Sequence, residues 1–271
     1  MDNRKFFAFD LDGTLLNSDQ QLSEDNIKAL EAAREKGHVL VMATGRNYIY
    51  SQLSLKQHWG LFDYFIGCNG ALIHSIHQRD VISKDNKIDY DFILKIIDEV
   101  KEIGGIVQIS TEWNVFTDLF IDEEIQIMTK INKERLIDPF PSIALMSYED
   151  KKSVVQISVH FEEHNVRKVW AKWLDKYGEN YEFAITSPRN IDINLKGINK
   201  LSAIKEIVKL EEIKFDNVFV FGDSQNDIKG LEYYNNTYAM ENALEETKKA
   251  AKNIIGSNDS NAIVKVVMKN I

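Results

Sequence analysis

The chain has 271 residues, of which 44% are hydrophobic and 28% are charged, and its formal net charge is −9 at pH 7. These values are typical of a globular protein that buries a sizeable core, and they exclude an intrinsically disordered chain. The negative charge argues against nucleic acid or an anionic membrane surface as a partner, because both attract clustered Lys and Arg, whereas local cations and a metal ion could still bind a phosphorylated ligand.

The N-terminal stretch before residue 10 has too few apolar residues for a signal-peptide core. No apolar run anywhere in the sequence is long enough to cross a bilayer. Cys68 is the only cysteine, so no disulfide can form within the chain, as is usual in a reducing compartment. We therefore expect a cytoplasmic protein with no membrane partner.

Several short apolar runs end abruptly in small or polar residues, and they cover residues 5–9, 38–42, 64–67 and 217–221. Continuous apolar runs of this length are typical of strands buried on both faces, as in a parallel sheet. Amphipathic stretches at residues 23–37 and 198–210 have the spacing of helices. The alternation of strand and helix predicts an α/β fold with a doubly wound, mostly parallel sheet.

The middle of the chain has a different pattern, in which paired short strands are joined by turns. The expected helices cover residues 90–103, 123–132 and 164–177, and the expected strands cover residues 106–111, 115–120, 154–161 and 181–185. This pattern predicts an α+β unit inserted into the first domain. We place the main domain at residues 1–83 and 188–271 and the inserted domain at residues 84–187.

The first polar cluster follows the first apolar run, which leads directly into Asp10 and then, after one residue, into Asp12 and Gly13. A carboxylate is ionised at neutral pH, so Asp10 could attack phosphorus without a base. Two carboxylates this close need a compensating cation, and Mg²⁺ with oxygen ligands is the simplest one. An ordinary Asp-Gly turn would not need Asp10, so the cluster favours a phosphoryl-transfer site.

The second cluster consists of Thr44, Gly45 and Arg46, directly after the second apolar run. It offers a hydroxyl, a close backbone approach and a guanidinium that could bind phosphate, although alone it is more often an ordinary loop. The third cluster is a single residue, Lys200, near the start of the 198–210 helix, where a cation could neutralise charge on a transferring phosphoryl group. Most lysines are simply solvated, so Lys200 gains its meaning only from the other clusters.

The fourth cluster, GDSQND at residues 222–227, follows the last apolar run. Asp223 could complete an oxygen-only metal site, and Asp227 could support either the metal or the lysine, although carboxylates at a helix start are also ordinary caps. Because the carboxyl ends of parallel strands meet at one edge of a sheet, the four clusters should converge there. Together they supply a nucleophile, an acid or base, a hydroxyl, a cation and metal ligands, which is a complete set for phosphoryl transfer.

These residues, in this order, resemble the four motifs of the haloacid-dehalogenase-like (HAD) superfamily, and the resemblance covers essentially the whole chain. DLDGT, which begins at Asp10, is similar to the first motif, Thr44 to the second, Lys200 to the third and GDSQND to the fourth. The long gap between the second and third motifs would hold an α+β cap like that of the Cof-like hydrolases. The sequences TGR at 44–46, CNGA at 68–71 and SND at 257–259 are also similar to that subgroup.

The resemblance implies a Rossmann-like core and a Mg²⁺-dependent phosphatase that hydrolyses a small phosphorylated metabolite, such as a sugar phosphate or a phosphorylated cofactor. Asp10 would form an aspartyl-phosphate, and Asp12 would act as general acid and then as general base. The implied metal ligands are Asp10, the backbone carbonyl of Asp12, and Asp223. The implied phosphate or substrate contacts are Thr44, Gly45, Arg46, Lys200 and Asn226, with Asp227 as a supporting residue.

Two alternatives stay open at this point. A phosphotransferase similar to the phosphohexomutases would move the phosphoryl group to a sugar, and a non-catalytic phosphoacceptor module would only carry it, since receiver domains also place acidic clusters at strand ends. The length, the insertion and Asp12, which a mere phosphoacceptor does not need, favour hydrolysis.

Overall fold

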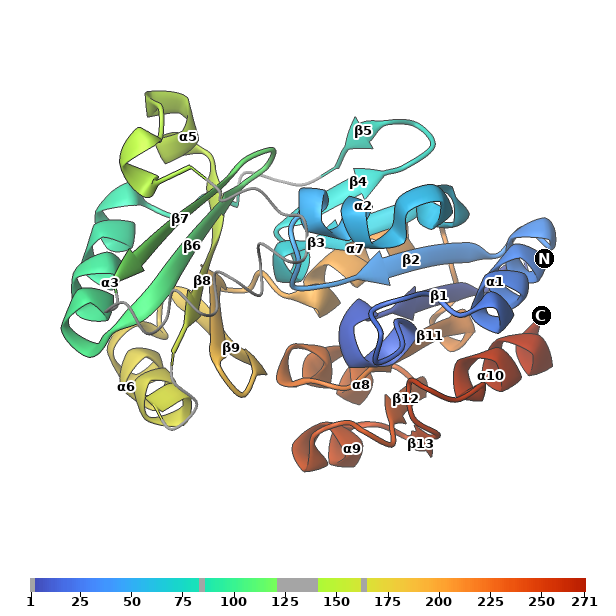
Figure 1. Ribbon diagram of the computed structural model, residues 1–271. Helices are drawn as coiled ribbons and strands as arrows, with labels where there is room; N and C mark the ends of the chain where they lie inside the picture. Colours follow the sequence, from blue (N-terminus) through green and yellow to red (C-terminus); the bar gives the residue numbers. More distant parts are fainter. Residues whose placement is uncertain (1–2, 83–85, 121–140, 162–164) are drawn as a thin grey trace. The chain divides into compact units, whose positions relative to one another are not determined.

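The computed structural model describes residues 3–82, 86–120, 141–161 and 165–271 (Figure 1). The chain divides into two compact units, of which the first is Met1–Lys84 with Ile198–Ile271 and the second is Asp85–Gly197. The helix expected at residues 123–132 lies outside the described residues.

The first unit contains an eight-stranded sheet with the order β13-β12-β11-β1-β2-β3-β4-β5. Its strands are β1 (Phe6–Phe9), β2 (Val39–Ala43), β3 (Tyr64–Gly67), β4 (Leu72–Ser75), β5 (Asp80–Val81), β11 (Val218–Gly222), β12 (Asn236–Met240) and β13 (Asn253–Ile255). All neighbours from β13 to β3 are parallel, and β4 and β5 form an antiparallel edge. The predicted α/β class with a mostly parallel sheet is confirmed.

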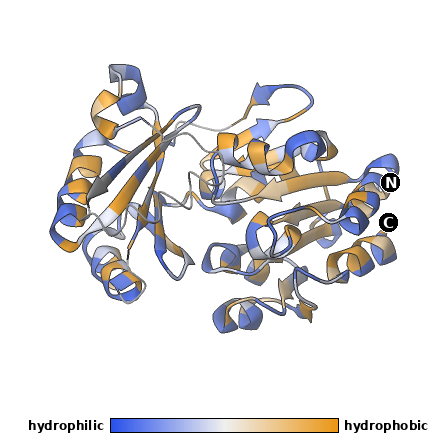
Figure 2. Cartoon of the chain, viewed as in Figure 1, coloured by the Kyte–Doolittle hydropathy of each residue, from blue (hydrophilic) through white to orange (hydrophobic). Residues whose placement is uncertain are grey.

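Every residue of β1, β2, β3 and β11 is buried, which explains why these strands have continuous apolar sequences. Hydrophobic colours run along the strands of this sheet, whereas its helices alternate between hydrophobic and hydrophilic residues (Figure 2). Neighbouring side chains on one strand point to opposite faces, so Ala8 and Val220 pack on the face covered by α7 and α8, while the Phe9 and Phe221 rings stack with centroids 4.9 Å apart.

The helices of the first unit are α1 (Glu24–Glu35), α2 (Tyr48–Leu55), α7 (Lys200–Leu210), α8 (Ile228–Tyr233), α9 (Glu245–Ala250) and α10 (Ala262–Asn270). Helix α7 begins with a capping box, in which Asn199 accepts a hydrogen bond from the backbone N–H of Ser202, and the Ser202 hydroxyl oxygen accepts one from the backbone N–H of Asn199. This cap fixes where the helix starts. It therefore places Lys200 in the first turn, at the end of α7 that lies closest to the polar clusters.

The second unit is an antiparallel five-stranded sheet with the order β7-β6-β8-β10-β9 and helices that pack against it. Its elements are α3 (Tyr90–Ile103), β6 (Gly105–Thr111), β7 (Val115–Phe120), α5 (Tyr148–Lys152), β8 (Val154–His160), α6 (Val166–Tyr177), β9 (Tyr181–Ser187) and β10 (Asn190–Leu195). We expected the inserted domain to end at residue 187. The compact unit instead runs to Gly197, because β10 pairs with both β8 and β9.

Candidate active site

The carboxyl ends of β1, β2 and β11 lie side by side, and each is followed by one of the polar clusters. The backbone N–H of Asp10 donates to the carbonyl of Phe221 at 3.1 Å, which joins the end of β1 to the end of β11. This pairing brings Asp10 next to the loop that carries Asp223. The register of the sheet therefore produces the convergence that the sequence predicted.

Lys200 connects the first and fourth clusters inside the protein. Its Nζ donates to Asp10 Oδ1 at 2.6 Å and to Asp227 Oδ1 at 2.7 Å, and only 2% of the Lys200 surface is exposed. Burial alone would lower the pKa of Lys200, but the two carboxylates outweigh burial and raise this pKa above its ordinary value. Lys200 is therefore a buried cation that two carboxylates hold in place.

Burial is the largest influence on the pKa of Asp10 and raises it, and the carboxylates of Asp227, Asp223 and Asp12 raise it further. Together they outweigh the attraction of Lys200 and raise the pKa of Asp10 well above its ordinary value. Extra positive charge beside Asp10 would counter this effect and favour the carboxylate.

Asp227 uses both of its carboxylate oxygens within the protein. Oδ1 accepts from Lys200, and Oδ2 accepts from the backbone N–H groups of Asp223 at 3.0 Å and Ser224 at 3.1 Å. Of the two roles that the sequence left open for Asp227, support of the lysine is the one visible in these contacts. Asp227 also fixes the backbone of the loop from which Asp223 projects.

Asp223 is held by two hydroxyl groups, Thr14 Oγ1 at 2.9 Å and Ser224 Oγ at 3.0 Å. Burial, followed by the repulsion from Asp227, raises the pKa of Asp223 to about 6. Gly13 has φ of +73°, and a Cβ at this position would lie 2.6 Å from Asp223 Oδ2. Only glycine therefore gives Asp223 the space to approach the loop after β1.

These residues fit a hard divalent cation such as Mg²⁺. Asp10, Asp223 and Asp227 each offer a carboxylate oxygen, and these oxygens lie within 4.8 Å of one another. Among the described residues of the site, four carboxylates face only two cationic side chains, so a divalent ion would balance the charge. The buried Oδ1 of Asn226 has no hydrogen-bond partner among the residues that the structure describes, and it offers a further oxygen. An all-oxygen donor set of this kind suits Mg²⁺.

The second cluster follows β2 as the sequence predicted. Thr44 is buried, its backbone N–H donates to Ile66 at 2.8 Å, and its hydroxyl oxygen accepts from the backbone N–H of Arg46 at 3.1 Å. Gly45 is half-buried between them. The guanidinium of Arg46 binds the side chain of Asp12, with Nε 2.7 Å from Oδ2, so its predicted contact to phosphate remains a prediction.

Asn69 is a site residue to which sequence reasoning gave no role. Its Oδ1 accepts from Asn226 Nδ2 at 2.8 Å, and its backbone N–H donates to the carbonyl of Thr44 at 3.0 Å. The turn after β3 that contains Asn69 also packs on the start of α7, because a Cβ on Gly70 would lie 2.3 Å from the carbonyl oxygen of Asn199. The signal was available, since this turn follows a buried apolar run as the other clusters do.

The C-terminal SND sequence supports the loop after β1. Asn258 Nδ2 donates to the carbonyl of Leu16 at 2.9 Å, and the Asp259 carboxylate accepts from the backbone N–H and the hydroxyl of Ser18 at 2.8 and 2.7 Å. These contacts join residues that are 242 and 241 positions apart in sequence. They explain how the end of the chain contributes to the shape of the site.

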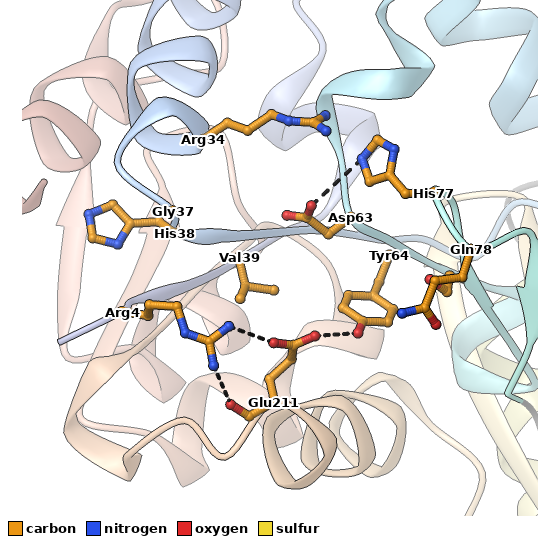
Figure 3. A pocket seen from close by; sticks show the side chains of 11 residues that line it. Arg4, Arg34, Gly37, His38, Val39, Asp63, Tyr64, His77, Gln78 and Glu211 are labelled. Carbon is orange, nitrogen blue, oxygen red and sulfur yellow. Dashed lines mark hydrogen bonds and ion pairs between the residues drawn. The ribbon is translucent and has the colours of Figure 1, made fainter. Parts of the chain in front are cut away.

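A separate cavity of about 340 Å³ lies where β2 and β3 begin, at the opposite ends of these strands (Figure 3). Two of its contacts converge on Glu211: Arg4 donates to Glu211 Oε2 at 2.7 Å, and the Tyr64 hydroxyl donates to the other Glu211 oxygen. Glu211 follows the C-terminus of α7, whose first residue is Lys200. The cavity contacts thus anchor the helix that carries the buried lysine.

Comparisons with known proteins show which family the chain resembles. A family model described as haloacid dehalogenase-like hydrolase matches residues 7–267. The 5-amino-6-(5-phospho-D-ribitylamino)uracil phosphatase YitU of Bacillus subtilis (strain 168) is 26% identical over 95% of this chain and 94% of its own. The pyridoxal phosphate phosphatase YbhA of Escherichia coli (strain K12) is 24% identical over 98% of each chain.

Solved structures show the same fold. The HAD subclass IIB sugar phosphatase BT4131 is 27% identical, with a TM-score of 0.81 over 98% of this chain and 100% of that one. The TM0651 protein of Thermotoga maritima is 22% identical, with a TM-score of 0.77 over 98% of this chain and 97% of that one. In the part of the chain that the structure describes, no helix combines the length and the apolar character needed to span a membrane.

Proposed function

The chain belongs to the haloacid dehalogenase-like hydrolases and is a phosphatase, and we propose that it hydrolyses a small phosphorylated metabolite through an aspartyl-phosphate intermediate on Asp10. The observation that carries this proposal is the buried contact between Lys200 Nζ and Asp10 Oδ1, 2.6 Å long. It fixes a carboxylate at the end of a central strand beside a cation that can face an incoming phosphate.

Each residue of the site then has a defined task. Asp10 attacks phosphorus, while Lys200 and the hydroxyl of Thr44 donate to the phosphoryl oxygens. Asp12 gives a proton to the leaving oxygen and afterwards takes one from the water that cleaves the aspartyl-phosphate, which releases inorganic phosphate. The leaving alcohol and the phosphate together account for all atoms of the ester and the water.

Mg²⁺ would be held by Asp10 and Asp223, with the Asp12 carbonyl and Asn226 as further oxygen donors, and would supply positive charge against the phosphoryl oxygens. Asp227 keeps Lys200 in place, and Gly45 leaves space for the phosphate beside the backbone.

Names of the relatives support a small phosphorylated metabolite as the substrate class. YitU is named for a phosphorylated ribitylaminouracil, YbhA for pyridoxal phosphate and BT4131 for sugar phosphates. We assign selection among such metabolites to the second unit, residues 85–197. The site itself recognises only the phosphoryl group, so it does not distinguish among them.

The test is release of inorganic phosphate from an aryl phosphate in the presence of Mg²⁺. Asp10→Asn keeps the size of the side chain but removes the nucleophilic charge, so we expect its turnover to fall by several orders of magnitude. Full activity of Asp10→Asn would contradict the proposal. Transfer of phosphate to an added sugar without release of inorganic phosphate would identify a phosphotransferase instead.

A further inference from the structure

Arg46 binds the carboxylate of Asp12 with two adjacent groups of its guanidinium. Its Nε donates to Oδ2 at 2.7 Å, and its Nη2 donates to Oδ1. This fork-to-fork geometry fixes the plane of the carboxylate as well as its position, which a single hydrogen bond cannot do.

Asp12 needs such a partner because its side chain is 47% exposed, whereas that of Asp10 is 7% exposed. Packing holds Asp10 in one orientation, but a half-exposed carboxylate on a loop would rotate among rotamers. A general acid must lie within hydrogen-bond reach of the oxygen that it protonates, and a displacement of about 1 Å can cost about 10²-fold in rate.

Arg46 is itself held from two further directions. Its Nη1 donates to the hydroxyl of Ser54 in α2, and its Nη2 also donates to Oε1 of Gln20. The Ser54 hydroxyl in turn donates to the carbonyl of Tyr50 at 2.9 Å. The guanidinium therefore has partners on three segments of the chain, and little freedom to move toward a phosphate.

Gln20 reaches Arg46 from an unusual backbone conformation. Its φ is +59°, in the left-handed region that residues other than glycine rarely adopt. The turn is closed by the backbone N–H of Gln20, which donates to the carbonyl of Asn17 at 2.9 Å. Strain of this kind is kept where the surrounding structure needs it, and here it delivers the amide oxygen to Arg46.

We propose that Arg46 is a positioning residue that aims the Asp12 carboxyl group at the leaving oxygen, and that Gln20 and Ser54 hold Arg46 for this purpose. The inference rests on the proposed function, because it gives Asp12 the role of general acid. It replaces the direct phosphate contact that the sequence predicted for Arg46.

The test compares two substrates that differ in their need for an acid. A nitrophenyl phosphate releases a stable phenolate and needs no proton, whereas an alkyl phosphate such as a sugar phosphate needs one. The measured quantity is kcat/KM, which reports the steps up to departure of the leaving group. We expect Arg46→Gln to lower kcat/KM for the alkyl phosphate by roughly 10- to 100-fold more than for the nitrophenyl phosphate.

Three comparisons separate positioning from other roles. Asp12→Asn should show the same substrate pattern, and adding Arg46→Gln to it should cause no further loss, because both changes remove one function. Arg46→Lys keeps the charge but not the fork, so it should restore little. Arg34→Gln is the matched control, since Arg34 donates to the carbonyl of Gly60 outside the site. Its loss should leave the ratio of kcat/KM between the two substrates unchanged.

An equal loss for both substrates with a raised KM would show a phosphate contact and overturn the proposal, and so would full rescue by Arg46→Lys. If Arg46→Gln does not fold, Gln20→Ala and Ser54→Ala each remove one partner of Arg46. Each should cause a smaller loss of kcat/KM that is again greater for the alkyl phosphate than for the nitrophenyl phosphate. If the ratio of kcat/KM between the two substrates is unchanged in both of these variants, the proposal is also overturned. Failure of the proposed function looks different, because wild type would then release no phosphate or Asp10→Asn would stay active.

Discussion

Lys200 Nζ lies 2.6 Å from Asp10 Oδ1 although 190 positions separate the two residues in sequence, and both side chains are buried. Their contact exists because Asp10 directly follows the end of β1 and α7 begins at Lys200, with the turn after β3 packed against the start of α7. Since Asp227 accepts from the same ammonium group, one cation serves two buried carboxylates.

Removal of this cation should damage both stability and activity. Lys200→Met leaves Asp10 and Asp227 buried without their partner, which should lower the free energy of unfolding by about 3–5 kcal/mol. Turnover should fall by about 10²- to 10³-fold, because the phosphoryl group loses a donor. Urea unfolding and phosphate release measure the two effects, and Lys209→Met, an exposed lysine near the other end of α7, is the control.

The double variant Lys200→Met with Asp10→Asn tests the cause of the destabilisation. Removing the charge of Asp10 should recover part of the lost stability, because one fewer charge is buried without a partner. If the losses of unfolding free energy in the two single variants simply add in the double variant, the contact between Lys200 and Asp10 contributes nothing specific to stability.

Two glycines allow backbone strain to be separated from the shape of the metal site. Gly13 and Gly37 have φ of +73° and +77°, so alanine should cost about 1–2 kcal/mol of stability at either position. Only at Gly13 would the new Cβ meet Asp223, while Gly37 has nothing within 4 Å. We therefore expect Gly13→Ala, but not Gly37→Ala, to weaken Mg²⁺ affinity by about 10- to 100-fold, measured by titration of activity and by calorimetry. Equal Mg²⁺ affinity in the two variants would count against the metal site.

Removal of the metal is a direct test of cofactor dependence. Treatment with a chelator should abolish phosphate release, and added Mg²⁺ should restore it, because the site has more carboxylates than cations. Asp12→Asn should bind Mg²⁺ as wild type does in calorimetry, since only the backbone carbonyl of Asp12 is assigned to the metal. Chelator-resistant turnover would contradict the assignment.

In the second unit, one carboxylate should control stability at low pH. Burial by itself would raise the pKa of Glu99, but hydrogen bonds from Lys176, Tyr177, Lys172 and Trp173 outweigh burial and lower this pKa to about 2. Because the folded pKa lies below the unfolded one, Glu99 stabilises the fold above pH about 4.5, and this contribution is lost as the pH falls toward about 2.

The difference in unfolding free energy between wild type and Glu99→Gln should therefore be largest near neutral pH and should shrink across that window. Urea unfolding at several pH values measures it. Glu102→Gln removes an exposed carboxylate from the same helix and should leave the stability almost unchanged. A difference that stays constant with pH would show that the charge of Glu99 is not the cause.

Much of the fold and site could be predicted because local patterns encode them. The buried strands are continuous apolar runs, and the residues that follow them, Asp10, Thr44 and Asp223, carry polar groups at the correct edge. Contacts between distant segments could not be predicted this way. Asn69 contacts Asn226, and Arg46 contacts Asp12, and no local pattern links the partners of either pair.

Strand β10 was missed for a different reason. Its polar residues Asn190, Asp192 and Asn194 are buried, so the segment lacks the apolar run that marked the other central strands. Two of these side chains bind partners inside the unit, since Asp192 accepts from the hydroxyl of Ser158 at 2.7 Å and Asn194 Nδ2 donates to the carbonyl of Val155 at 3.0 Å. Hydrophobicity alone therefore placed the boundary of the second unit too early.

The central claim is that phosphate becomes bonded to Asp10. The most direct measurement is mass spectrometry of peptides from Asp12→Asn protein that has been mixed with Mg²⁺ and a nitrophenyl phosphate and quenched in acid. This substrate needs no general acid to form the intermediate, and loss of the general base should slow hydrolysis of the intermediate. We predict a phosphorylated peptide that contains Asp10, dependent on Mg²⁺ and absent when Asp10→Asn is added. Turnover of substrate with phosphate on a different residue, or on none, would contradict the mechanism.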